Sequence, residues 1–139
     1  MDNSMKIEFL SKSSNEAFAR VAVAAFVSQL DPTIEELSEI KTAVSEGVTN
    51  AIIHGYDNKN GLVEVTCTLT DRLVTIIIKD NGKGIADIAQ AMEPLYTSCP
   101  EMERSGLGFT VMQTFSDSID VVSELGKGTT ITLLKRLSD

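Results

Sequence analysis

Residues 33–56 read TIEELSEIKTAVSEGVTNAIIHGY. Within this stretch apolar residues recur three or four positions apart, which is the spacing of one face of an amphipathic helix. The members of this stripe are Leu37, Ile40, Val44, Val48 and Ala51. Thr33 followed by Glu36 is a candidate capping box at the helix start, and Gly55 is a plausible stop. We therefore predict a long helix from Thr33 to His54 with one face against a core.

The remaining elements follow on either side of this helix. We predict a strand over 5–10, a helix over 13–30 opened by a second candidate capping box, Ser13 with Glu16, and a strand pair over 63–69 and 73–78. An irregular stretch over 85–105, a helix carrying Phe109, Met112 and Phe115, and a final strand pair over 119–123 and 129–134 complete the order. Strands joined by short turns pair antiparallel. We expect an α+β two-layer sandwich, a mixed and mostly antiparallel sheet covered by helices, with residues 1–139 forming one domain.

Composition excludes several classes of protein. The 139 residues carry 12 basic and 20 acidic side chains, a net charge of −8, which disfavours direct binding to nucleic acid. Two cysteines, Cys67 and Cys99, are too few for a disulfide framework, and alternation with Val65 and Leu69 places Cys67 in the core. We expect no secretory leader, because the polar start Met1-Asp2-Asn3-Ser4 lacks a basic region before an apolar run, and no membrane span, because no apolar run is long enough. We expect a soluble cytoplasmic protein.

The first polar cluster lies on the long helix, where Glu46, Asn50 and His54 are each four residues apart. Glu46 and Asn50 lie about 40° apart around the axis and roughly 160° from Val48. A solvated polar face explains this spacing, and so does a carboxylate and an amide arranged around a cation and a substrate. His54 fits a hydrogen-bonding residue near a helix end better than a metal or catalytic role.

Two further clusters are rich in glycine. Asp80-Asn81-Gly82-Lys83-Gly84 follows the most hydrophobic strand, and the residue types suit either a tight turn or a loop that approaches a ligand. Arg104-Ser105-Gly106-Leu107-Gly108 precedes a helix, where free amides and an arginine suit a phosphate, although a flexible loop has the same composition. Gly128-Thr129-Thr130 enters the last strand and is a fourth candidate, or simply hairpin chemistry.

In this order and at these separations, the four clusters resemble the motifs of the GHKL or Bergerat-fold ATPases, which include DNA gyrase and the histidine kinases. E-x-x-x-N is Glu46 to Asn50, D-x-G-x-G starts at Asp80, G-x-G is Gly106 to Gly108, and G-T-[TS] starts at Gly128. The resemblance extends from Lys6 to Lys135.

Further stretches resemble the anti-sigma-F factors of endospore-forming bacteria, a family of serine kinases within these ATPases. They are Phe18-Ala19-Arg20, Asp31-Pro32-Thr33, residues 46–56 and residues 103–106. One departure is Gly47, where the family pattern leads us to expect alanine; a glycine inside a helix costs about 1 kcal/mol.

The resemblance implies a role for each motif residue. Asn50 would hold Mg²⁺ through its side-chain oxygen, and Glu46 would act as the base or the orienting acceptor for the attacking hydroxyl. Asp80 would accept the adenine amino group, with Gly82 and Gly84 close to the base. The phosphates would be contacted by Arg104, Ser105, Gly106 and Gly108. Residues 95–105 would form a lid over the nucleotide, and Thr130 would support the adenine pocket near Asp80.

The implied reaction is transfer of a phosphoryl group from ATP, with Mg²⁺, to a serine of the anti-anti-sigma factor. The second implied partner is the sporulation sigma factor F, held inactive by a homodimer of this chain, with Arg20 at a partner-contact position. A general-stress anti-sigma kinase of the same family, a nucleotide-gated binding module without turnover, and an ATP-hydrolysing clamp are the alternatives.

Overall fold

The computed structural model describes residues 2–57, 59–92 and 108–139. The strands are β1 (Asp2–Leu10), β2 (Leu62–Thr70), β3 (Leu73–Asp80), β4 (Ser118–Glu124) and β5 (Gly128–Arg136). The α-helices are α1 (Ser14–Val27), α2 (Ile34–Asn50), α3 (Ile88–Ala91) and α4 (Gly108–Thr114), with a 3₁₀ turn at Ser28–Leu30 and a π-helix at Ala51–Gly55.

The five strands form a single sheet in the order β1-β2-β3-β5-β4, and all four neighbouring pairs are antiparallel. The expected fold class is confirmed, but the described part of the chain contains no parallel pair, so the sheet is not mixed. The reason is the place of β5. It lies between β3 and β4, which run in the same direction, and so it separates the two strands that would otherwise form a parallel pair.

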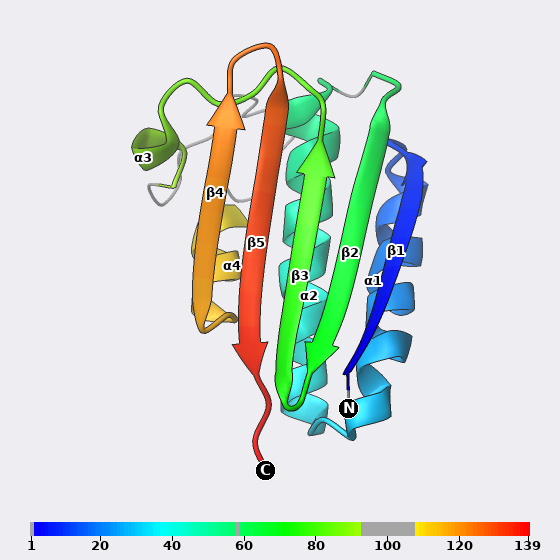
Figure 1. Cartoon of the computed structure of the whole chain (residues 1–139). Coiled ribbons are helices and arrows are strands. Elements are labelled where there is room, and N and C mark those ends of the chain that lie inside the picture. The colour runs from blue at the N-terminus through cyan, green and yellow to red at the C-terminus, as the bar shows by residue number, and fades with distance from the viewer. Residues whose placement is uncertain (1, 58, 93–107) are drawn as a thin grey trace.

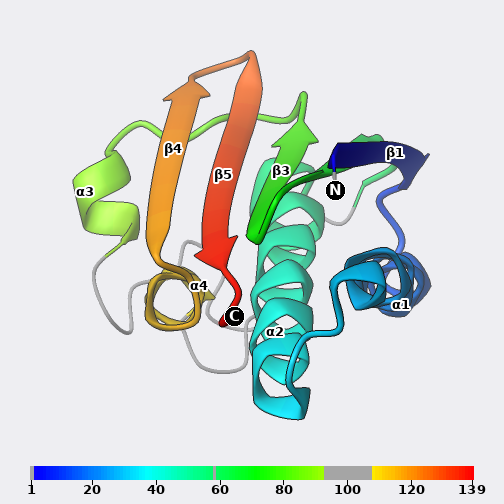
Figure 2. The same cartoon turned by 60° about the horizontal axis from the view of Figure 1, so that its bottom comes forward.

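Helices α1, α2 and α4 lie on one face of the sheet, with α2 under its centre, as Figure 1 and Figure 2 show from two sides. The predicted stripe of α2 faces this sheet: Ile40, Val44, Val48 and Ala51 are buried, and Leu37 is half-buried. Along the central strands β2 and β3 every second residue is buried, as expected for a sheet covered on one side. The core therefore lies between α2 and the sheet. Among the described residues no helix is both long and apolar enough to cross a membrane.

Of the two predicted capping boxes, one is present in the structure, at the start of α2. At α2, the Glu36 amide donates to the Thr33 hydroxyl at 3.0 Å and the Thr33 amide donates to the Glu36 carboxylate at 2.9 Å, which confirms that box. At α1 the prediction was wrong. Ser13 has helical backbone angles, and its carbonyl oxygen accepts the Glu16 amide at 3.2 Å in place of the hydroxyl. A capping side chain needs an extended residue, as Thr33 is.

Several predicted boundaries also shift. Strand β1 begins at Asp2, three residues before the prediction, because its polar start pairs with the end of β2. The predicted long helix ends in a π-helix that reaches Gly55, and Phe115 lies just beyond the end of α4. The stretch expected to be irregular contains α3, and its residues 93–105 lie outside the described part.

Candidate functional site

Asp80 is the last residue of β3 and its side chain is only 4% exposed. The Gly82 amide donates to its Oδ1 at 2.8 Å, and the Thr129 amide also donates to the carboxylate. Burial raises the pKa of Asp80, whereas these two hydrogen bonds act in the opposite direction. The structure thus holds a carboxylate in a fixed orientation at the end of the most hydrophobic strand.

The loop after Asp80 packs directly on the end of the π-helix. A Cβ on Gly82 would lie 2.0 Å from the carbonyl oxygen of Gly55, so only glycine fits there. The same Gly55 oxygen accepts the Lys83 amide at 2.9 Å. Gly55 itself lies against Asp80, since a Cβ on it would come within 2.8 Å of the carboxylate. The end of the long helix and the D-x-G-x-G loop therefore form one packed unit.

The turn between β4 and β5 closes the other side of this loop. Gly128 has a φ of +114°, and a Cβ on it would lie 2.1 Å from the backbone oxygen of Asp80. A side chain at Gly84, where φ is +78°, would meet the backbone of Glu124 in the same way. The Gly126 amide adds a hydrogen bond of 2.8 Å to the loop. The second and fourth motifs are thus in contact, at the end of the sheet where β3 finishes (Figure 1).

The side chain expected beside Asp80 is not the one found there. In the sheet register Asp80 pairs with Thr129, whereas Thr130 pairs with exposed Lys79 and lies on the opposite face. The prediction that Thr130 lies near Asp80 is therefore wrong, and buried Thr129 takes that position. Counting back in twos from core residue Ile131 would have identified Thr129 from the sequence alone.

The polar face of α2 that carries Glu46 and Asn50 is partly buried. Glu46 and Asn50 are both half-buried on the last two turns of the helix, and His54 is half-buried within the π-helix that follows. Four residues separate Asn50 from Gly55, which lies against Asp80. The structure therefore places the E-x-x-x-N motif on the segment that leads directly to the buried carboxylate.

The third motif is only partly described. Gly108 is half-buried and begins α4, which packs on α2: a Cβ on Gly47 would lie 3.5 Å from the sulfur of Met112. The last glycine of the G-x-G motif therefore starts a helix that packs against α2 at Gly47, the residue next to Glu46. Arg104, Ser105 and Gly106, the predicted lid over 95–105, and Cys99 lie outside the described residues.

Comparison with known proteins agrees with this arrangement. Residues 10–135 match the model of the histidine kinase-like ATPase domain family. The anti-sigma F factor of Clostridium kluyveri is 63% identical over 134 residues, which are 96% of this chain and 94% of that protein. Those of Clostridium beijerinckii and Clostridium acetobutylicum are 62% and 57% identical over 138 residues, 99% of this chain and 96% of each relative.

The chain belongs to the anti-sigma F factor family. It shares with that family the histidine kinase-like ATPase domain, which implies nucleotide binding and an activity that uses ATP. The resemblance inferred from the motifs is confirmed.

The residues present fit the magnesium ion that such a domain uses. The described residues hold no cluster of three or more His, Cys, Asp and Glu side chains. Mg²⁺ that arrives with a nucleotide keeps several waters and takes only one or two protein oxygens. The side-chain oxygen of half-buried Asn50, near the end of α2, is a ligand of this kind.

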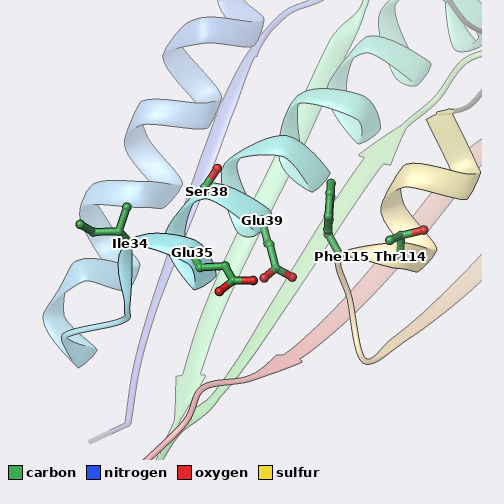
Figure 3. Close-up of a pocket in the computed structure, with 6 residues that line it drawn as sticks. All are labelled: Ile34, Glu35, Ser38, Glu39, Thr114 and Phe115. Carbon is green, nitrogen blue, oxygen red and sulfur yellow. The ribbon is translucent and has the colours of Figure 1, made fainter.

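A groove of about 720 Å³ lies at the opposite end of α2 and does not suit a nucleotide. Its walls are formed by Ile34, Glu35, Ser38, Glu39, Thr114 and Phe115, all outside the four motifs (Figure 3). Glu39 is paired with Lys135 at 3.0 Å, which leaves the exposed Glu35 carboxylate to repel an anionic phosphate chain. The groove is therefore separate from the motif residues that surround Asp80.

Arg20 lies on α1, on the other side of α2 from α4 (Figure 2). Its guanidinium is 3.8 Å from the Glu16 carboxylate, one turn earlier, and the side chain is 39% exposed. An exposed pair of this kind contributes little to stability, so the arginine can exchange partners at small cost.

Proposed function

We propose that this chain is an anti-sigma factor that binds and inhibits the sporulation sigma factor F. As an ATP-dependent serine kinase, it also phosphorylates and so inactivates the anti-anti-sigma factor. The observation that carries the proposal is the convergence of the motif segments on the buried Asp80, in a chain whose relatives are named anti-sigma F factor.

Recognition of the adenine base rests on Asp80. Its carboxylate is oriented by the amides of Gly82 and Thr129, and its burial strengthens any hydrogen bond that it accepts. An adenine amino group would donate to this carboxylate, and Gly82 and Gly84 let the loop beside it pack tightly against Gly55 and Glu124.

The phosphates would lie along α2 toward Glu46. Asn50 would hold Mg²⁺, whose chemistry when bound is to neutralise negative charge on the phosphate oxygens. Gly108 would contact a phosphate at the start of α4, with Arg104, Ser105 and Gly106 completing the phosphate contacts. Residues 95–105 would cover the nucleotide and exclude water.

Glu46 would accept the proton of the substrate serine. As that proton leaves, the serine oxygen forms a bond to the γ-phosphorus and the bond to the bridging oxygen breaks, which releases ADP. Positioning of the two reactants supplies much of the rate in such a transfer. The half-burial of Glu46 supports this role, because the carboxylate lies at a partly enclosed surface.

Partner binding would use α1. Arg20 is half-exposed, and its ion pair with Glu16 in the described part of the chain is long, which supports a contact with an acidic group of a partner. We propose that the chain acts in the cytoplasm as a homodimer that holds the sigma factor, and that Arg20 belongs to the partner-binding surface.

The test is incubation of the protein with labelled ATP, Mg²⁺ and the anti-anti-sigma factor, followed by mapping of the phosphorylated residue. Glu46→Gln should lose serine phosphorylation and keep both ATP and sigma-factor binding. Glu35→Gln is the matched control, because it makes the same change at the exposed first turn of the same helix.

Two outcomes would overturn the kinase proposal. Steady ATP hydrolysis without a phosphoprotein would indicate an ATP-driven clamp. Sigma-factor binding that responds to nucleotide without phosphorylation would indicate a gated binding module. Unchanged phosphorylation by Glu46→Gln would remove Glu46 from the mechanism. Co-purification with a general-stress sigma factor in place of sigma factor F would instead contradict the proposed partner.

A further inference from the structure

Two hydroxyl groups hold the loop that follows Asp80, one at each end. At its start, the Asn81 amide donates to the Tyr56 hydroxyl oxygen at 2.7 Å. The same hydroxyl donates its proton to the Leu62 carbonyl oxygen at 2.6 Å. The ring is fixed as well, since a Cβ on Gly61 would lie 2.3 Å from it. Tyr56 thus ties the loop to the beginning of β2.

At the far end of the loop, the Ile85 amide donates to the Ser123 hydroxyl oxygen at 2.7 Å. Ser123 gives its single proton to the Gly128 carbonyl oxygen at 3.0 Å. The contact of 2.8 Å between the Ser123 and Thr129 hydroxyls is then made with the Thr129 proton. Ser123 therefore ties the loop to the turn between β4 and β5, beside the residue whose amide binds Asp80.

These ties add to the hydrogen bonds that Gly82 and Lys83 make in the middle of the loop, and they fix its two ends. Gly82 and Gly84 must be glycine to fit against neighbouring backbones, and glycine is the residue with the greatest conformational freedom. Both lie between the two tied amides, at positions 81 and 85. Ordinary turns are closed by contacts within the turn, whereas here both hydroxyls come from distant parts of the chain, Tyr56 after the π-helix and Ser123 in β4.

We propose that Tyr56 and Ser123 are positioning residues of the nucleotide site, which hold the Asn81–Ile85 loop in the form that selects adenine over guanine. The proposal rests on the proposed nucleotide site at Asp80. The amino group of adenine donates to a carboxylate, whereas guanine presents a carbonyl oxygen at the same position and is repelled. The selection requires the carboxylate and the loop backbone to stay in register, and the two hydroxyls maintain that register.

The experiment measures ADP and GDP binding to the full chain with Mg²⁺ by calorimetry. Tyr56→Phe and Ser123→Ala should each weaken ADP binding by about tenfold, the factor that corresponds to one lost hydrogen bond. GDP binding should stay as weak as in the unaltered protein, so the ratio of the two affinities falls. Ser123→Thr keeps the hydroxyl and should restore ADP affinity.

Thr33→Ala is the control for stability alone. It removes the capping box at the far end of α2, so it should lower the urea midpoint without changing either affinity. If Tyr56→Phe fails to fold, the ADP affinities of Ser123→Ala and Ser123→Thr still test whether the hydroxyl at position 123 supports nucleotide binding.

The proposal fails if both hydroxyl deletions bind ADP as tightly as the unaltered protein, which would leave the proposed function intact. It also fails if ADP and GDP affinities fall by the same factor. Absence of ADP binding in the unaltered protein would overturn the nucleotide site itself and this inference with it.

Discussion

Replacing Gly47 by alanine sets two opposing effects on α2 against each other. Alanine is favoured over glycine inside a helix by about 1 kcal/mol. However, Gly47 is buried against β3, and its new Cβ would lie 2.3 Å from the Cδ1 methyl of Ile78. Ile78 is only 2% exposed, so that methyl has to move within a close-packed core.

The structure predicts that overpacking exceeds the gain in helix propensity. Forcing one extra methyl into a packed core costs about 1–3 kcal/mol, which leaves Gly47→Ala destabilised by about 1 kcal/mol. Ile78→Val alone should cost about 1 kcal/mol, because it removes the Cδ1 methyl and leaves a small cavity. In the double variant the alanine methyl occupies that cavity. Its stability should return to within about 0.5 kcal/mol of the unaltered protein, a coupling of about 1.5 kcal/mol.

Urea unfolding of the four proteins, followed by circular dichroism, measures this double-mutant cycle. If the two single effects add to within about 0.5 kcal/mol, the two side chains are not competing for one space and the packing argument is wrong. A stabilised Gly47→Ala single variant would contradict it equally, since Ile78 would then be free to give way.

Three further predictions concern charge, capping and thiol chemistry. Burial raises the pKa of Asp80 above its usual value of 3.8, so the native state binds the carboxyl proton more tightly than the unfolded chain does. The free energy of unfolding therefore falls as the pH rises through the raised pKa. Asp80→Asn should therefore gain stability relative to the unaltered protein from about pH 4 toward neutral pH in urea titrations, and a pH-independent difference would contradict this. Thr33→Ala should lower the free energy of unfolding, measured by urea titration, by about 1 kcal/mol. Thr42→Ala should lower it by less than half as much, because it removes only a hydroxyl contact to Ser38 on the surface of the same helix. Burial raises the pKa of the Cys67 thiol to about 12, so mass-spectrometric mapping should find Cys67 unlabelled by iodoacetamide until urea unfolds the protein; labelling at the native rate of a free thiol would refute its burial.

Local sequence patterns predicted the elements better than their ends. The stripe of α2 follows from spacing alone, since one apolar face needs only the helical period. The two candidate capping boxes show the limit. Thr33 with Glu36 and Ser13 with Glu16 have the same spacing, but only Thr33 has the extended backbone that aims its hydroxyl at the helix. That backbone depends on the preceding chain, which the spacing does not describe.

The candidate site was predicted as residues but not as an arrangement. Asp80, Gly82 and Gly84 can be selected from their types and order, because few residues tolerate such turns. Contact between Gly128 and Asp80 depends on β5 lying between β3 and β4, which no local pattern determines. The choice between Thr129 and Thr130 was missed for a simpler reason: the alternation of β5 was not counted back to its first residues.

Titration of ATP with Mg²⁺ into the full chain, compared with Asp80→Asn, tests the account most directly. The account predicts saturable binding of one nucleotide per chain, and loss of that binding in Asp80→Asn while circular dichroism shows that this variant remains folded. Equal binding by the two proteins, or no binding by the unaltered protein, would contradict the claim that the buried carboxylate at the end of β3 receives the base.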